Sequence, residues 1–126
     1  MNKIFIRKTV RGKLPGLPFA RIKSAILGDL YELSLVFAGD TLTRRLNRTH
    51  RGKDKSANVL SFPLEQNSGE IFLNLQQAKK DAPRFEKLYN AFVGFLFIHA
   101  CLHLKGMRHG KQMENTEKRW CKKFGL

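Results

Sequence analysis

The sequence predicts an α+β fold, a single domain in which a small mixed sheet of about four strands packs against helices. A length of 126 residues fits one domain. Short strand-like segments bounded by glycine and proline are interspersed with segments of helical periodicity. We find no internal repeat or low-complexity linker that would divide the chain, so residues 1–126 are treated as one domain.

The first half of the chain predicts two strands and two helices. Residues 3–9 alternate loosely and predict a strand, and the apolar spacing that follows predicts a helix ending at Gly28. Residues 31–38 predict a second strand. We expect Asp40 to be the N-cap of the second helix, which Gly52 closes.

Two further strands are predicted in the middle of the chain. Residues 57–62 form the first, which we expect Pro63 to stop, and residues 70–75 form the second, opened by Gly69. A polar loop joins them, so they are either a hairpin or neighbouring strands.

The longest predicted helix comes next and should lie at the centre of the fold. Asp81 and Pro83 are start signals, and residues 84–104 become apolar on nearly every side after Tyr89, as in a buried helix. Gly106 ends this helix. An amphipathic helix is predicted from about Lys111 onward.

The charge balance favours an anionic partner. The chain carries 24 Lys and Arg against 10 Asp and Glu, a formal net charge of +14. A field of that strength attracts polyanions, which makes nucleic acid the leading partner class and anionic membrane a weaker one. We expect no membrane span, because the longest apolar stretch, residues 91–104, is shorter than the roughly 18 residues required.

The compartment predicted from the sequence is the cytoplasm. Residues 1–10 lack the apolar stretch of a secretory signal. The two cysteines, Cys101 and Cys121, are therefore expected to be free thiols in a reducing environment, and both are expected to pack in the core.

Three of the four histidines cluster within eleven residues. His99 and His103 lie about 40° apart on one helical face, one turn from each other, so both imidazoles can reach a common ion. Gly106 can turn the chain back and bring His109 to the same point. Three imidazoles with a fourth position open are typical of catalytic zinc, although nickel, copper or iron would also fit.

The histidine spacing matches the zinc-protease pattern HExxHxxGxxH, but the residue after the first histidine is Ala100. The glutamate of that pattern is the general base of those proteases. A peptidase is therefore disfavoured.

A basic segment, residues 44–55 (RRLNRTHRGKDK), suits phosphate contact, although a solvated helix face explains most of its charges equally well. Arg51 is the exception, because it stands where the helix gives way to a loop. A guanidinium there could clamp a phosphate bidentately. The neighbouring His50 is favoured as a surface residue over an acid or base.

Three blocks together resemble the YbeY family: LNRTHRGKD at 46–54, NVLSFP at 58–63 and HxxxHLxGxxH at 99–109. The resemblance extends over residues 31–126. It implies a zinc-dependent endoribonuclease specific for single-stranded RNA, acting in ribosomal RNA maturation and ribosome quality control, with ribosomal RNA and the ribosome as partners.

The resemblance also implies the site. It assigns one zinc ion to His99, His103 and His109, and places the family's active-site arginine on Arg51. Two departures concern neighbouring positions: Arg108 replaces the usual aspartate before the third histidine, and Asn58 replaces another common aspartate. The first removes a carboxylate that could orient a ligand.

The function classes that remain open differ in what the histidines do. In an endoribonuclease the metal is catalytic, and either water or the RNA 2′-hydroxyl attacks the phosphate. A non-catalytic, basic RNA-binding ribosome-assembly factor would use the same histidines as a structural metal site. A hydrolase of small phosphate or amide substrates is the third class, but it leaves the charge of +14 unexplained.

Overall fold

The computed structural model describes all 126 residues, Met1–Leu126, and strands and helices mix along the chain as predicted. The strands are β1 (Ile4–Lys8), β2 (Glu32–Phe37), β3 (Val59–Glu65) and β4 (Ser68–Leu73). The helices are α1 (Phe19–Leu27), α2 (Asp40–Arg51), α3 (Leu75–Asp81), the 3₁₀ helix η1 (Ala82–Phe85), α4 (Tyr89–Leu104) and α5 (Lys111–Lys123). This composition confirms the α+β class.

The four strands form one mixed sheet in the order β1-β2-β4-β3. β1, β2 and β4 run parallel, whereas β3 runs antiparallel to β4. Leu35 of β2 lies opposite Ile6 on one side and Ile71 on the other. The predicted pair in the middle of the chain is therefore a hairpin, and β3 is an edge strand.

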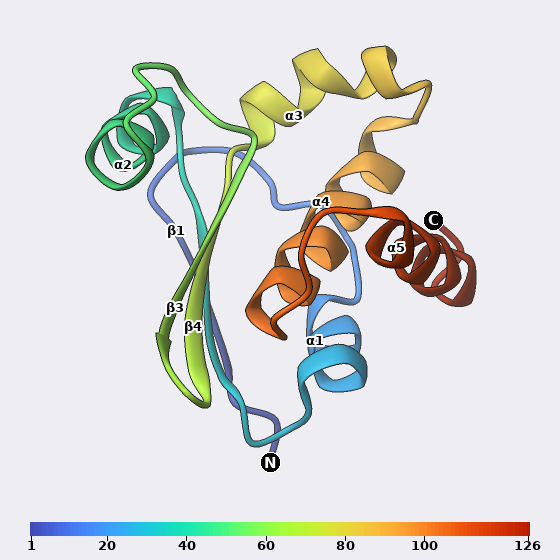
Figure 1. Ribbon diagram of the computed structural model, residues 1–126. Coiled ribbons are helices and arrows are strands. Elements are labelled where there is room, and N and C mark those ends of the chain that lie inside the picture. The colour runs from blue at the N-terminus through green and yellow to red at the C-terminus, as the bar shows by residue number, and fades with distance from the viewer.

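Helices cover both faces of the sheet (Figure 1), with α2 on one side and α1, α4 and α5 on the other. The alternation of β2 produces this division. Leu33, Leu35 and Phe37 join the main core with α1 and α4, and Val36 packs with Leu60 in a smaller cluster toward α2. Because successive side chains of a strand point to opposite faces, one strand contributes to both cores.

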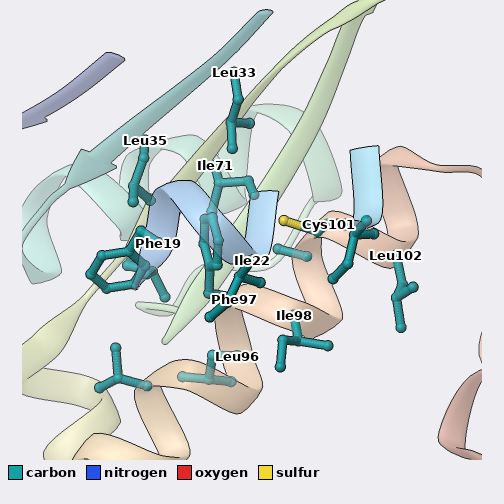
Figure 2. Packing of buried hydrophobic residues seen from close by; sticks show 14 of the residues in the cluster. Phe19, Ile22, Leu33, Leu35, Ile71, Leu96, Phe97, Ile98, Cys101 and Leu102 are labelled. Atoms are coloured by element: carbon teal, nitrogen blue, oxygen red, sulfur yellow. The ribbon is translucent and has the colours of Figure 1, made fainter. Parts of the chain in front are cut away.

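α4 is the central helix of the fold, as predicted. Figure 2 shows Phe97 and Cys101 of α4 in the same cluster as Ile22 of α1 and Ile71 of β4. The ring of Phe97 also meets Phe19 of α1 edge-on, with 5.0 Å between centroids. This packing fixes α4 against the sheet and α1, and α5 contacts α4 as well.

α4 is also a strongly apolar helix. No single helix of the structure is long and apolar enough to cross a bilayer. One pair of segments, Leu75–Phe85 and Tyr89–Leu104, passes the length and composition criteria jointly, and it bends by 103° at the break.

The predicted start of the long helix is wrong. α3 and η1 precede α4 as separate segments, and Glu86 takes a left-handed conformation with φ of 54° between them. Asp81 does not cap α4, because its carboxylate accepts hydrogen bonds from Asn58 and Gln77. Pro83 lies in the first turn of the short η1 instead.

Two smaller expectations also fail. Gly39, not Asp40, is the N-cap of α2, and the Asp40 carboxylate accepts a hydrogen bond from Asn74 at 2.7 Å. β3 continues through Pro63 to Glu65, with a register shift between them. An edge strand tolerates proline because only one of its sides must donate to the ladder.

Candidate metal centre

The last turns of α4 bring the first two histidines together. His99 and His103 are one turn apart, and their rings meet edge-on with 4.5 Å between centroids. The Nε2 atoms of the two rings are 3.0 Å apart. Both rings are partly buried between α4 and its neighbours, as the helical spacing predicts.

A turn after α4 returns the chain to these two rings. Gly106 adopts φ of 106°, a conformation that favours glycine, and the Met107 amide donates back to the Leu102 carbonyl at 3.0 Å.

The turn places the third histidine beside the pair. The ring centroid of His109 lies 5.2 Å from that of His99 and 4.4 Å from that of His103. One ring nitrogen from each histidine lies within 4.8 Å of the other two. The predicted convergence of three imidazoles is present.

The outer nitrogens of two rings have oxygen partners. His99 Nδ1 lies 2.8 Å from a carboxylate oxygen of Glu117, and His103 Nδ1 lies 3.1 Å from the Met107 carbonyl. In neutral rings these partners place the hydrogen on Nδ1, which leaves a lone pair on each Nε2. Two lone pairs facing each other repel, and a cation between them removes that repulsion. This arrangement fits a metal ion.

The surroundings of His103 favour the neutral form of its ring. Burial lowers its pKa, and the nearby charges of His99, His109 and Arg51 act in the same direction. The hydrogen bond to the Met107 carbonyl opposes them. A neutral imidazole is the form that binds metal.

The histidines face a pocket of about 210 Å³ between α4 and the edge strand β3. Arg51, the last residue of α2, lines this pocket together with the three histidines. The remaining lining residues are Asn58, Val59, Ser61 and Ala100. The structure thus brings together all four residues that the sequence singled out.

A family model described as Endoribonuclease YbeY matches residues 17–125. The chain belongs to the YbeY family. The matched segment includes all four predicted site residues and begins earlier than the resemblance that the sequence motifs carried.

Individual members of the YbeY family are similar over most of the chain. The relative from Persephonella marina is 31% identical over 130 residues, covering 93% of this chain and 85% of its own length. The relative from Alkaliphilus metalliredigens is 34% identical over 100 residues and 71% of this chain. A Mycoplasma mycoides relative is 36% identical over 98 residues and 69% of this chain. All three are named Endoribonuclease YbeY.

The match covers different shares of these relatives. It spans 64% of the Alkaliphilus protein and 58% of the Mycoplasma protein, less than two thirds of either length. A solution structure from Thermotoga maritima has the same fold, with a TM-score of 0.65 and 24% identity over 96% of this chain and 88% of its own.

One site residue was missed by the sequence reasoning. Glu117 of α5 is 5% exposed, and its carboxylate contacts His99. The YbeY motifs had drawn attention to the missing aspartate at Arg108 as a lost orienting group. The structure shows that a carboxylate from another helix contacts one of the three candidate ligands, His99. Its signal in the sequence was the pattern Met113-Glu114-x-x-Glu117 of the last helix, which belongs to the resemblance to the YbeY family but indicated no role for this glutamate.

Three other residues that the sequence singled out lie outside the metal pocket. His50 is exposed and its ring packs 5.0 Å from that of Phe62. Cys101 and Cys121 are buried, as expected. Asn58, which stands where the YbeY motif usually has aspartate, does line the pocket, and it donates to Asp81 at 3.0 Å.

Proposed function

We propose that this protein is a metal-dependent endoribonuclease that cleaves single-stranded RNA. Its substrate is ribosomal RNA, its roles are rRNA maturation and ribosome quality control, and its compartment is the cytoplasm. The names of its YbeY relatives and the charge of +14 support this assignment.

The observation that carries the proposal is the convergence of His99, His103 and His109 on a pocket that also contains Arg51. A closed structural zinc site has four protein ligands, often including cysteine. Here three imidazoles open onto a pocket beside a cation. That combination suits a reaction at a phosphate.

The metal that the three imidazoles suit best is zinc, one ion per chain. When bound, zinc supplies a Lewis acid that activates water and polarises a phosphoryl oxygen. Two contacts orient the imidazoles that would hold the ion. Glu117 fixes the ring of His99, and the Met107 carbonyl fixes that of His103.

Arg51 acts on the substrate. Its guanidinium donates to two phosphate oxygens and offsets the negative charge that develops on the phosphoryl oxygens in the transition state. Ala100 leaves no carboxylate at the position where related zinc sites carry a general base. Either water or the neighbouring 2′-hydroxyl of the RNA therefore attacks phosphorus, and a cyclic 2′,3′-phosphate product identifies the second route.

The first experiment compares metal content and cleavage in wild type and the His103→Ala variant. Both proteins are purified without added metal or affinity-tag histidines and assayed on a structured rRNA fragment. We expect about one zinc per wild-type chain. Zinc and cleavage should be lost together in a variant that remains folded by circular dichroism. Zinc without metal-dependent cleavage by the wild type would instead indicate a non-catalytic assembly factor.

The second experiment separates Arg51 from the metal. Arg51→Ala should retain zinc and fold but lose roughly a hundredfold or more in cleavage rate, as for other groups that stabilise transition-state charge. Arg45→Ala, an exposed arginine of the same helix, is the matched control. Equal rates for the two variants would contradict the role of Arg51.

A further inference from the structure

A second, larger pocket of about 460 Å³ adjoins the metal pocket. The two pockets share Arg51, Asn58 and Val59 as lining residues. The second pocket extends between the loop that follows α2 and the α3–η1 segment. A strand bound across the metal pocket therefore has a continuous path into this neighbouring space.

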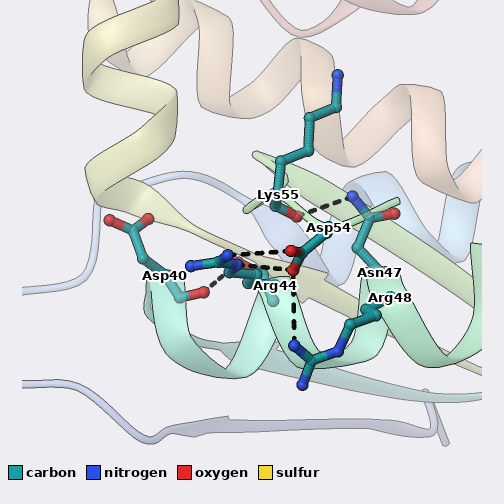
Figure 3. A network of polar contacts seen from close by, with 7 residues as sticks. Asp40, Arg44, Asn47, Arg48, Asp54 and Lys55 are labelled. Carbon is teal, nitrogen blue, oxygen red and sulfur yellow. Dashed lines mark hydrogen bonds and ion pairs between the residues drawn. The ribbon is translucent and has the colours of Figure 1, made fainter. Parts of the chain in front are cut away.

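The loop that follows α2 contributes two lysines to the lining of this pocket, and neither lysine is paired with an acidic residue. Asp54, which stands between them, is held on α2 by Arg44 at 2.9 Å and Arg48 at 3.6 Å. Figure 3 shows the Lys55 side chain directed away from this carboxylate. Lys53 and Lys55 both line the pocket, and neither takes part in an ion pair.

A buried asparagine of α2 fixes this loop. Asn47 is 2% exposed, and its side-chain amide donates to the Lys55 carbonyl at 3.0 Å (Figure 3). Its backbone carbonyl accepts from the Lys53 amide at 3.3 Å. These two hydrogen bonds hold the loop backbone from which both lysine side chains extend.

The opposite wall carries a third cation. Arg84 of η1 lies 3.7 Å from a carboxylate oxygen of Asp81. That carboxylate also accepts hydrogen bonds from Asn58 at 3.0 Å and Gln77 at 3.1 Å. Asp81 is the one acidic residue lining the pocket, and its oxygens are engaged by these neighbours. The pocket thus combines four cations with one carboxylate.

We propose that this pocket binds a backbone phosphate of single-stranded RNA next to the bond that is cleaved, through Lys53, Lys55 and Arg84. The inference rests on the proposed RNA substrate and adds a neighbouring subsite to it. A phosphate suits the pocket because lysine and arginine contacts to phosphate supply most of the sequence-independent affinity for nucleic acid. Such contacts set the register of the strand over the metal pocket.

The test measures binding, so it does not depend on cleavage. A fluorescent 2′-O-methyl RNA dodecamer is titrated with zinc-loaded protein, and gel electrophoresis verifies that the RNA stays intact. We expect Lys53→Ala/Lys55→Ala to raise the dissociation constant roughly ten- to thirtyfold at 0.1 M salt. The slope of log affinity against log salt should become shallower by about 0.7, the value for the loss of one neutralised phosphate on a single strand.

The matched control is Lys122→Ala/Lys123→Ala, two exposed lysines at the end of α5 that carry the same charge. This pair should change the dissociation constant less than about threefold, and Lys53→Arg/Lys55→Arg should restore binding because it keeps both charges. If both double alanine variants weakened RNA binding equally, the subsite would be overturned, because the affinity would then depend on the overall positive charge of the protein.

An affinity for inorganic phosphate as high as that for the RNA, measured at constant ionic strength, would also overturn the inference, since it would assign the pocket to the free ion. Zinc content and thermal melting of each variant confirm that the metal centre and the fold are intact. If the wild type did not cleave RNA, the proposed function would be contradicted. The binding experiment would still test the subsite, because it does not depend on cleavage.

Discussion

Two contacts orient imidazoles of the candidate metal centre, one from a residue close by in the sequence and one from a distant residue. Met107, only four residues from His103, accepts from its ring through the backbone. Glu117 reaches His99 from the next helix through a buried side chain. An oriented ring loses less freedom when it binds metal, and a carboxylate partner also makes the ligand more basic.

Glu117→Gln should therefore weaken metal binding. The amide oxygen still accepts from the His99 ring, but the negative charge that strengthens the ligand is gone. We expect a roughly tenfold to hundredfold loss of zinc affinity, measured by competition with a chromogenic chelator. Glu114→Gln, an exposed glutamate on the same helix, is the control and should bind zinc as the wild type does. Wild-type affinity in both variants would contradict the orienting role of Glu117.

The two cysteines should be unreactive in the folded protein. Burial raises the pKa of both thiols, so at pH 8 the reactive thiolate is scarce in each. Alkylation by iodoacetamide should be at least about a hundredfold slower in the native protein than in guanidinium, and faster at Cys121 than at the fully buried Cys101. Mass spectrometry of peptides follows both sites. Equally rapid labelling of Cys101 in the two conditions would disprove its burial.

At the scale of elements, the turn between α4 and α5 completes the cluster of three histidines. α4 alone presents two histidines, and the third arrives only because the chain reverses after Leu104. Gly106 makes that reversal with φ of 106°, where an L side chain is strained. The end of α4 and the turn at Gly106 therefore place the three histidines together.

Gly106→Ala should reduce both stability and metal affinity. Strain at this position should lower the free energy of unfolding by about 1–2 kcal/mol, and the displaced turn should move His109 away from the other two rings. Urea unfolding and zinc competition measure the two effects. Gly16→Ala, where φ is ordinary and the added carbon meets no neighbour within 4 Å, should leave zinc affinity unchanged. Unaltered zinc affinity in Gly106→Ala would show that His109 does not depend on the turn.

Several boundaries of helices and strands depend on contacts with distant segments, which the local sequence pattern does not predict. Asp81 looked like a helix start, but Asn58 and Gln77 hold its carboxylate. Pro63 looked like a strand stop, but it lies on an edge strand where proline is tolerated. Capping and strand-breaking rules describe a residue's neighbours in sequence, whereas these residues have partners from other segments.

At the scale of the whole molecule, the charge of +14 should dominate RNA affinity. Phosphate contacts release counterions, so binding to a single strand weakens with a slope of about 0.7 per contact. We expect the dissociation constant for an intact RNA oligonucleotide to rise about tenfold or more between 50 and 200 mM salt, followed by fluorescence anisotropy. A flat response would contradict electrostatic binding.

The sequence by itself determined the fold class, the central helix and the three histidines. These followed because hydrophobic periodicity, glycine positions and ligand spacing are local properties that survive in any compact arrangement. Residues 99–109 hold all three predicted ligands within one helix and one turn, so no distant contact was needed to find them.

Only the tertiary structure decided what surrounds that cluster. Arg51 lies beside the histidines because the end of α2 and the edge strand β3 meet α4 at one pocket, and Glu117 contacts His99 because α5 packs on α4. Lys53, one of the basic segment's cations, is available to a phosphate because the neighbouring Asp54 pairs with Arg44 and Arg48. Such contacts depend on how the elements pack. Packing joins residues that are far apart along the chain, and their spacing in the sequence does not predict that they meet.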